Sequence, residues 1–360
     1  MSANLRRGLL IGLGLVALLL VVWLSQPTRG PRDVPTPHKP DEEKPDATAG
    51  SYLFCFWNLE NLFDDVDDKR KSKGDPEYDH FFGHDPDALK YKLAHLADVL
   101  IPLNDGRGPD LLGVCEVESE RAARLLADTL NKRLGKEAYA VVFKQSGSGR
   151  HISPALLTKL PVVGDRTDVW GNRQRILKTV VRVNGHDLMV VVSHWTSRLT
   201  DKEGKGRKHY ADAIYGQYKA AFLAARREGK DLDFLLCGDF NDNPDDVSVA
   251  EHLHATGDLA RVKAKDEPLL FDLMAKPYAD GRSSIDGPRK KNFIFDHLCV
   301  SPGMFDDVGW SCDPGSATIV TSFANNKGMP NRFGGPNDKR PFSARGASDH
   351  FPVSVKLLVR

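Results

Sequence analysis

Cysteine is scarce in this sequence of 360 residues, and none of the five cysteines has a metal-binding spacing. Their number is odd, and there is no CxxC pair and no cysteine–histidine cluster. A disulfide scaffold, a structural zinc site and a nucleophilic cysteine are therefore not indicated. Four of them, Cys55, Cys115, Cys237 and Cys299, lie inside apolar runs. We interpret these as buried core side chains, because unpaired cysteine commonly packs as a small hydrophobe.

The sequence also lacks internal repeats, a second linker and an excess of charge of one sign. The formal net charge is +1, which argues neither for nor against a polyanionic partner, because local clustering matters more than the sum. With 41% hydrophobic residues, the chain has enough apolar side chains for a core of normal size. We therefore expect a single folded domain over residues 51–360.

Only the N-terminus holds a long apolar run. Residues 8–24 contain no charged side chain, and Arg6 and Arg7 precede them. This length is at the short edge of the roughly 17–25 residues that span a bilayer. A small-x-small cleavage site is missing, because Trp23 and Leu24 occupy the relevant places.

Residues 1–25 are therefore predicted to be an uncleaved signal anchor, with a cleaved signal peptide as the alternative. The two arginines favour a cytoplasmic N-terminus, which places the body outside the cytoplasm. The body is then membrane-anchored, or secreted or periplasmic after cleavage. Residues 26–50 are proline-rich and charged, which is typical of an extended linker.

From residue 51 onward, short apolar runs alternate with helical patterns. The runs predict strands, at 51–57, 109–115, 138–143, 154–163, 177–183, 187–195, 233–240, 293–300 and 351–359. Helical periodicity covers 87–103, 119–134 and 210–229. Several strands are apolar on both faces, as strands covered on both sides must be. This predicts one α/β domain with more strands than a simple doubly wound sheet needs.

Acids, amides and histidines fall where these apolar strands stop. Such positions include Asn58, Glu116, His194, Asp239 and Asp296. Each has a structural alternative, for example a turn-forming asparagine or a helix-capping glutamate. Six such sites in one chain instead indicate one convergent polar site, because α/β proteins project functional groups from strand ends.

The residue types predict the chemistry of that site. Oxygen ligands without a Cys or His cluster suit Mg²⁺, with Mn²⁺ or Ca²⁺ as alternatives, rather than zinc. Two histidines with carboxylate partners, His194 and His350, suit acid–base catalysis near neutral pH. Together these groups match the hydrolysis of a phosphate ester, in which water is oriented and charge on the phosphoryl oxygens is neutralised.

Six motifs carry a resemblance to a known family: WNLENLFD, GVCEVES, SHWTSR, GDFNDNP, FDHLCVS and ASDHFPV. Over about residues 54–355 the chain resembles the endonuclease/exonuclease/phosphatase superfamily, and most of all its exported or membrane-anchored bacterial members. The resemblance implies a deoxyribonuclease I-like α/β (α+β) fold, a four-layer sandwich of two mixed β-sheets flanked by helices.

The resemblance also implies roles for individual residues. Glu116 corresponds to the direct metal ligand, Asn58 and Asp349 to further metal-site residues, and Glu60 to an acidic position that serves a second metal. His350 corresponds to the general base.

Asp296 corresponds to the carboxylate that orients this base. His194, Asp239 and Asn241 correspond to residues that contact the phosphate and position the water or leaving group. Beside them, Arg198 and Trp195 are predicted to contact the substrate.

The substrate is less sharply indicated. Compared with apurinic endonucleases, His194 stands in place of an asparagine, which favours the deoxyribonuclease I and sphingomyelinase side of the family. Basic segments at 69–73, 205–209, 289–291 and 339–345 predict a rim that follows a nucleic-acid backbone, although scattered surface lysine is the alternative.

We therefore expect a metal-dependent nuclease, that is, a phosphodiesterase acting on nucleic acid. A phospholipid or sphingomyelin phosphodiesterase is the alternative, and a non-catalytic binding module on the same fold is the third possibility. No protein partner is predicted.

Overall fold

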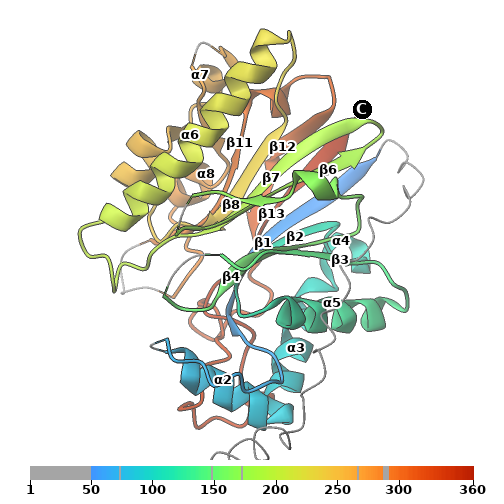
Figure 1. The fold of residues 1–360 in the computed structure, drawn as a ribbon, viewed down its shortest axis with the longest axis vertical. Coiled ribbons are helices and arrows are strands. Elements are labelled where there is room, and N and C mark those ends of the chain that lie inside the picture. The colour runs from blue at the N-terminus through green and yellow to red at the C-terminus, as the bar shows by residue number, and fades with distance from the viewer. Residues whose placement is uncertain (1–49, 73, 147–148, 172, 266, 287–291) are drawn as a thin grey trace, which may run out of the picture. The chain divides into compact units, whose positions relative to one another are not determined.

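Two mixed β-sheets packed face to face form the centre of the fold (Figure 1). The computed structural model describes residues 50–72, 74–146, 149–171, 173–265, 267–286 and 292–360. The predicted anchor and all but the last residue of the predicted linker lie outside these residues. Within them, no helix is long and apolar enough to cross a membrane.

The first sheet has the strand order β12-β13-β1-β2-β4-β3. At its centre, β1 (Ser51–Leu62) pairs in parallel with β2 (Leu111–Val117) and antiparallel with β13 (Val353–Val359). The remaining strands pair antiparallel with their neighbours, and they are β12 (Trp310–Ile319), β4 (Ser153–Thr158) and β3 (Ala140–Phe143). The sheet is therefore mixed.

The second sheet has the order β5-β6-β7-β8-β11-β10-β9. Its central pair, β7 (His186–His194) and β8 (Phe234–Asp239), is parallel. The other strands are β5 (Asp168–Val169), β6 (Arg175–Val183), β11 (Asp296–Val300), β10 (Leu270–Asp272) and β9 (Ala255–Thr256). Because β11 runs antiparallel to β8, its first residue, Asp296, lies opposite the last residue of β8, Asp239.

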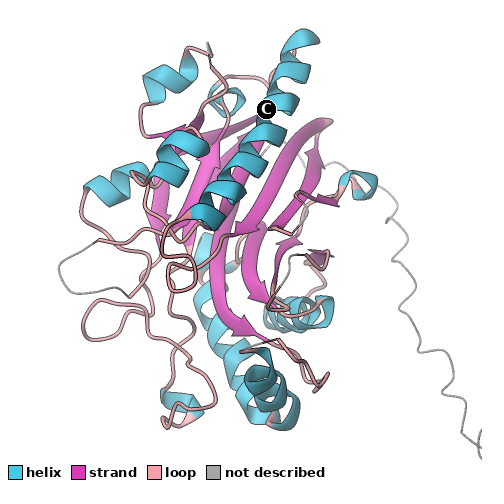
Figure 2. Cartoon of the chain, turned by 60° about the vertical axis from the view of Figure 1, so that its left-hand side comes forward, coloured by secondary structure: helices cyan, strands magenta, loops and turns pink. Residues whose placement is uncertain are grey.

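Alternating side chains of the central strands separate three buried cores. Phe54 and Phe56 of β1 face the second sheet, where they share a core with Val192 of β7. Trp57, on the opposite face of β1, packs in a core with helices α3 (Pro86–Leu100) and α5 (Glu120–Leu134). The second sheet is covered on its outer face by α6 (Lys205–Arg227), through residues such as Tyr218. The predicted four-layer sandwich is confirmed (Figure 2).

Local signals set the ends of the helices. The Asp85 side chain accepts a hydrogen bond from the Ala88 amide at the start of α3, and Ser119 does the same for Ala122 in α5. Gly135 ends α5 in the left-handed conformation that glycine adopts readily. Ser119, rather than Glu116, thus caps α5, and Glu116 remains available to the site.

Several elements were not predicted, of which α2 and β12 are the longest. Helix α2 (Asp75–His84) is short and mostly polar, so its helical periodicity is weak. Strand β12 is an edge strand with an irregular register and polar residues at its centre. The strand predicted at 154–163 instead ends at Thr158. Shorter helices are α4 (Leu103–Gly106), α7 (Leu259–Lys263) and α8 (Ala275–Ala279).

Candidate active site

The end of β1 bends into the site through an irregular stretch of backbone. Pairing between β1 and β2 shifts register between Asn58 and Leu62. Within this stretch Glu60 and Asn61 have positive φ angles of 51° and 58°, and Glu116 on β2 has a φ of 60°. Residues other than glycine rarely adopt this backbone conformation, which costs of the order of 1–2 kcal/mol per residue. The strain is therefore concentrated where the predicted site residues leave the sheet.

Asn58 joins the two sheets at the site. Its side-chain amide donates to Asp239 Oδ2 at 3.0 Å and to Glu116 Oε1 at 3.3 Å. Its Oδ1 accepts the Glu60 backbone N–H at 3.0 Å, which fixes the orientation of the amide. In this orientation Asn58 holds the carboxylates of Glu116 and Asp239 near each other, and its predicted place at the metal site stays a prediction.

Glu116 and Asp239 meet His194 across the gap between the sheets. His194 Nε2 lies 3.8 Å from Glu116 Oε1 and 3.8 Å from Asp239 Oδ2. His194 is 5% exposed, and its Nδ1 has no hydrogen-bond partner within the described residues. Burial lowers the pKa of His194 well below its ordinary value, and the charges of Arg175 and His350 act in the same direction. His194 is therefore neutral, so one ring nitrogen can donate a hydrogen bond and the other can accept one.

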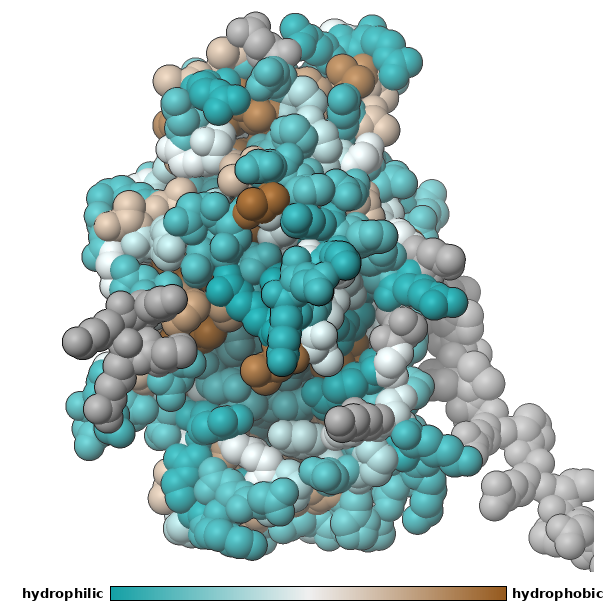
Figure 3. Space-filling view, turned by 90° about the vertical axis from the view of Figure 1, so that its left-hand side faces the viewer, coloured by the Kyte–Doolittle hydropathy of each residue, from teal (hydrophilic) through white to brown (hydrophobic). Residues whose placement is uncertain are grey.

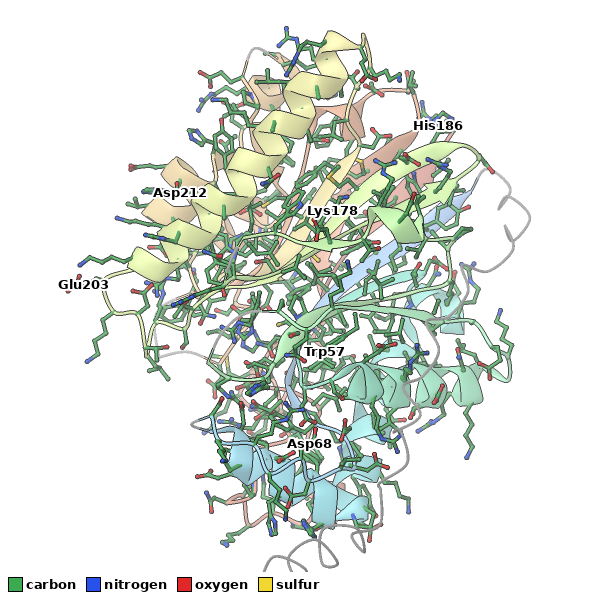
Figure 4. All side chains as sticks on the ribbon, viewed as in Figure 1. Trp57, Asp68, Lys178, His186, Glu203 and Asp212 are labelled. Carbon is green, nitrogen blue, oxygen red and sulfur yellow. The ribbon has the colours of Figure 1, made fainter. Side chains whose placement is uncertain are left out.

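His350 is oriented by a buried carboxylate. Its Nδ1 lies 2.9 Å and 3.1 Å from the two oxygens of Asp296, and Ser284 Oγ donates to the same carboxylate at 2.6 Å. The Nε2 atom then faces Asp239 Oδ2 at 3.8 Å. Trp57 lies on β1 and is labelled in Figure 4, and its Nε1 donates to the His350 carbonyl at 2.7 Å. The imidazole is thus held with one nitrogen directed into the site.

Charges around His350 change the acidity of these groups. Burial alone would lower the pKa of His350, but Asp296 and then Asp239 raise it well above its ordinary value. Burial is also the main cause that raises the pKa of Asp239 to about 7. Asp349 behaves similarly, since burial and the nearby Glu60 carboxylate raise its pKa to about 6. Strongly perturbed pKa values gathered in one place are typical of catalytic sites.

Asn241 lies beside these groups on the loop after β8. Its backbone N–H donates to Asp239 Oδ1 at 2.9 Å, and its side-chain amide donates to the Trp195 carbonyl at 3.2 Å. Its φ of 54° is also in the left-handed region. The structure therefore brings together Asn58, Glu116, His194, Asp239, Asn241, Asp296 and His350.

Glu60 is placed differently from its predicted role. Both of its carboxylate oxygens accept hydrogen bonds, from the backbone amides of Phe333 and Gly334 at 2.8 Å and 3.1 Å and from Arg332 Nε at 2.8 Å. Glu60 is 3% exposed. This geometry favours a carboxylate that fixes the 332–334 loop over a ligand for a second metal.

Arg332 is one of the site residues that the sequence did not reveal. Its guanidinium lies 2.7 Å from Glu60 and 3.6 Å from Asp349 Oδ2, and the side chain is 56% exposed. It lines a pocket of about 450 Å³. Asp349, His350, Asn325, Asn331 and Arg340 also line it. A cation at this position suits an anionic substrate group next to His350.

A buried lysine, Lys92, binds the backbone of two segments that lie beside the site. Lys92 on α3 is completely buried, and its Nζ donates to the Glu60 carbonyl at 3.2 Å and to the Ala347 carbonyl at 2.8 Å. Burial lowers the pKa of Lys92 to about 8. Lys92 thereby joins the end of β1 to the segment just before Asp349. No periodic or local sequence signal could have identified this contact between distant segments.

Arg150 provides a second unpredicted connection. Its guanidinium donates to Asn61 Oδ1 at 2.6 Å and to the buried Asp75 carboxylate at 2.9 Å. The Asn61 backbone N–H in turn donates to Glu116 Oε2 at 2.9 Å. Glu116 is therefore oriented through a chain of contacts that reaches α2.

The two predicted substrate-contacting residues are used within the protein. Trp195 is completely buried and stacks on Phe240 with ring centroids 4.2 Å apart, so it belongs to the core and cannot reach a substrate. Arg198 donates to the Asn241 carbonyl at 2.8 Å and also pairs with Asp242 and Asp246. Arg198 therefore stabilises the loop after β8 in this structure.

Much of the predicted basic rim is likewise engaged. Arg70 Nε pairs with Glu118 at 2.6 Å, buried Arg207 pairs with Asp242 at 2.7 Å, and Arg345 is 7% exposed. Residues 205–209 are the first turn of α6 rather than a loop, and 289–291 lie outside the described residues. The exposed positive charge that remains is carried mainly by lysines, such as Lys69 and Lys205. Figure 3 shows one face of this surface as largely hydrophilic, with only scattered hydrophobic side chains.

The donor set fits a hard divalent cation. The carboxylates of Glu116 and Asp239 both accept hydrogen bonds from the Asn58 amide. Asp349 immediately precedes His350 in the sequence. The raised pKa values of Asp239 and Asp349 reflect burial and neighbouring negative charge, which a cation would relieve. Within the described residues, the groups of three closely spaced ligand atoms lie elsewhere. A cation here would be held by Glu116 with water completing its shell, as Mg²⁺ commonly is.

Comparison with known proteins gives one family. A family described as "Endonuclease/Exonuclease/phosphatase family" matches residues 53–358. No curated protein sequence matches significantly.

Three solved structures illustrate the similarity. A mannosyl-6-phosphatase from Bacteroides thetaiotaomicron is 14% identical, with 85% of this chain and 99% of that chain covered and a TM-score of 0.48. Sphingomyelinase C from Streptomyces griseocarneus is 16% identical, with 85% and 99% covered and a TM-score of 0.47. D. rerio TDP2 complexed with a single-strand DNA product is 13% identical, with 86% and 99% covered and a TM-score of 0.47.

Proposed function

The chain belongs to the endonuclease/exonuclease/phosphatase family, a family of phosphoester hydrolases, and from that premise we propose that it is a divalent-metal-dependent phosphodiesterase. One observation carries the proposal. His350 is fixed by Asp296 at 2.9 Å with its free nitrogen directed at Asp239, beside a Glu116 carboxylate that a cation can use. This combines a general base with an oxygen-ligand site, which is the machinery that phosphoester hydrolysis requires.

In this proposal His350 activates the attacking water. Asp296 holds Nδ1–H, so Nε2 carries the lone pair that accepts a proton from the water. The water oxygen bonds to phosphorus, the bond from phosphorus to the leaving oxygen breaks, and the leaving oxygen takes a proton from the solvent. Neutral His194 and the Asn241 amide position the phosphoryl oxygens.

Glu116 is the residue proposed to hold the cation, with Asp349 as a further carboxylate. Mg²⁺ is the expected ion, and Mn²⁺ or Ca²⁺ are alternatives for the same oxygen donors. When bound, the ion supplies positive charge that neutralises the phosphoryl oxygens and lowers the pKa of the nearby imidazole. Asn58 keeps Glu116 and Asp239 close enough to act on the same phosphate.

Nucleic acid is the first proposed substrate, because the basic segments include highly exposed lysines such as Lys69 and Lys205, and a phosphate backbone binds such charge. A second candidate is a small phosphorylated molecule. It is favoured by the pocket of about 450 Å³ beside His350, to which Arg332 contributes an exposed guanidinium. The proposed location is outside the cytoplasm, held at the membrane or released, and it rests on the apolar N-terminal residues.

The test is hydrolysis by the purified full chain. Bis(p-nitrophenyl) phosphate, p-nitrophenyl phosphate, plasmid DNA and sphingomyelin are compared with Mg²⁺, Mn²⁺, Ca²⁺ or EDTA. We expect EDTA-sensitive cleavage of the diester that is lost in a folded His350→Ala variant, which excludes a contaminating hydrolase. The best natural substrate then assigns the branch. No hydrolysis of any substrate with any ion by the folded protein would refute the proposal.

A further inference from the structure

Two histidines on α2 converge with an aspartate from the preceding loop, away from the active site. His80 and His84 are four residues apart and therefore lie on one face of the helix. Their rings lie 4.4 Å apart between centroids. Asp67 Oδ2 is 2.9 Å from His84 Nε2 and 3.5 Å from His80 Nδ1. Within the described residues this is one of two places where three ligand atoms lie within 4.8 Å of one another.

The second group of three ligand atoms is not accessible to an ion from solvent. Asp272, His297 and Cys299 are all buried in the core. His297 Nδ1 pairs with Asp272 at 2.9 Å, and its Nε2 lies 2.9 Å from the Asp242 carbonyl. Both ring nitrogens are thus used by the protein, and solvent has no access. That triad supports the loop after β8 and leaves no position for an ion.

The Asp67 loop is held against α2 by contacts that do not involve the histidines. The buried Asp79 carboxylate accepts the backbone N–H groups of Asp68 at 3.1 Å and Arg70 at 3.0 Å. Gly83 permits the close approach, because a Cβ there would stand 2.7 Å from the Asp67 nitrogen. Figure 4 labels Asp68, the neighbour of Asp67, in the loop beside α2. The carboxylate is therefore positioned before any ion arrives.

The charges around Asp67 leave it available as a ligand. Its nearest lysine, Lys69, lies 3.5 Å away, and that side chain is 82% exposed, so the pair is weak. The hydrogen bond with His84 holds the pKa of the Asp67 carboxyl well below its usual range, so the group is ionised at neutral pH. Both histidine rings are more than half exposed. Solvent can therefore supply the remaining ligands.

We propose that Asp67, His80 and His84 form a binding site for a borderline divalent ion of the Zn²⁺ type. Zinc bonds to imidazole nitrogen and carboxylate oxygen are about 2.0–2.2 Å, so ligand atoms around a tetrahedral ion lie about 3.3 Å apart. The distances of 2.9 Å and 3.5 Å bracket that value. Three protein ligands and one water complete the tetrahedron. Two imidazoles distinguish this site from the oxygen donors of the active site, which suit harder ions.

A bound ion would cross-link the loop that carries Asp67 to helix α2. The same loop carries Arg70, which pairs with Glu118 at 2.6 Å, two residues from Glu116. Closing a loop onto a helix with metal bonds stabilises the folded state by binding it and not the unfolded chain. The expected role is therefore structural, and it does not depend on the phosphodiesterase proposal.

The experiment is a Zn²⁺ titration by calorimetry of the untagged, EDTA-treated full chain, in saturating Mg²⁺ so that the oxygen-donor site is occupied. We expect one Zn²⁺ site in the wild type. His80→Ala and His84→Ala should each weaken it by at least about 100-fold, since losing even a hydrogen-bond partner of a ligand costs about 10–100-fold. Circular dichroism checks that both variants are folded.

His252→Ala is the matched control. His252 Nδ1 lies 2.8 Å from Asp212, the same kind of surface pair, but the described residues offer no third closely spaced ligand atom there. This variant should bind Zn²⁺ as the wild type does. Co²⁺ added to the wild type should also give a tetrahedral visible spectrum that is lost in His84→Ala. Equal Zn²⁺ affinity and stoichiometry in the wild type and both α2 variants, or an unchanged Co²⁺ spectrum, would overturn the proposal.

Discussion

Replacing Asp296 by asparagine tests the catalytic arrangement most directly. The carboxylate is completely buried and contacts His350 Nδ1 at 2.9 Å and 3.1 Å, so the substitution keeps the shape and removes the charge. A hydrogen bond between charged groups contributes about 1.5–3 kcal/mol. The asparagine amide can also donate to Nδ1, which places the proton on Nε2 and removes the base. In serine proteases the same change costs about 10⁴-fold in kcat. We expect a loss of about 10³–10⁴-fold, equivalent to about 4–5.5 kcal/mol.

The assay is steady-state hydrolysis of bis(p-nitrophenyl) phosphate in saturating Mg²⁺, with folding checked by thermal unfolding. Ser284→Ala is the matched control, because it removes a neutral donor from the same carboxylate at 2.6 Å and leaves the charge in place. Its expected cost is about 1 kcal/mol, or about fivefold in kcat. If folded Asp296→Asn retains kcat within tenfold of the wild type, Asp296 does not orient a catalytic base.

Three further predictions address other parts of the molecule. Glu116→Gln should raise the Mg²⁺ concentration needed for half-maximal activity at least tenfold, and an unchanged Mg²⁺ titration would argue against Glu116 as the ligand. The pKa of Lys92 is lowered to about 8 in the folded state, so the unfolded chain binds more protons between about pH 8 and 10.5. Urea unfolding should therefore show that the free energy of unfolding of the wild type, measured relative to Lys92→Met, rises by about 3 kcal/mol across that pH window. If the two proteins instead show parallel curves of stability against pH, Lys92 does not carry a buried charge with a lowered pKa. Trp195→Ala should destabilise the fold by about 3–5 kcal/mol and leave KM unchanged, because Trp195 is a core residue. A rise in KM without a loss of stability would instead indicate that Trp195 contacts the substrate.

The centre of the site was predictable because it follows the ends of apolar strands. Glu116, Asp239 and Asp296 each stand at or next to the last or first residue of a strand, and adjacent strand ends necessarily lie together. The strand runs themselves were recognisable from their hydrophobicity, which used information within a few residues of the chain. The four-layer sandwich, in contrast, was implied by the resemblance of the six motifs to a known family.

The errors arose where sequence neighbours point in different directions. Trp195 was predicted to contact substrate because it follows His194, but successive residues of an extended chain face opposite sides, and this one faces the core. Glu60 and Arg332 meet across 272 positions of sequence, in a loop without periodicity. Lys92 and Ala347 are similarly distant. Contacts of this kind depend on the completed tertiary structure, which no local pattern encodes.

The way the site is divided between the two sheets has a consequence for how activity is acquired during folding. Asn58 and Glu116 come from one sheet, Asp239 and Asp296 come from the other, and the Trp57 side chain reaches the His350 carbonyl across 293 positions of sequence. No contiguous half of the chain can build a working centre by itself. Such long-range pairings form late and slowly, because loop closure must precede them. Turnover should thus be the last native property to return on refolding, which makes it a reporter of complete sheet docking rather than of secondary structure.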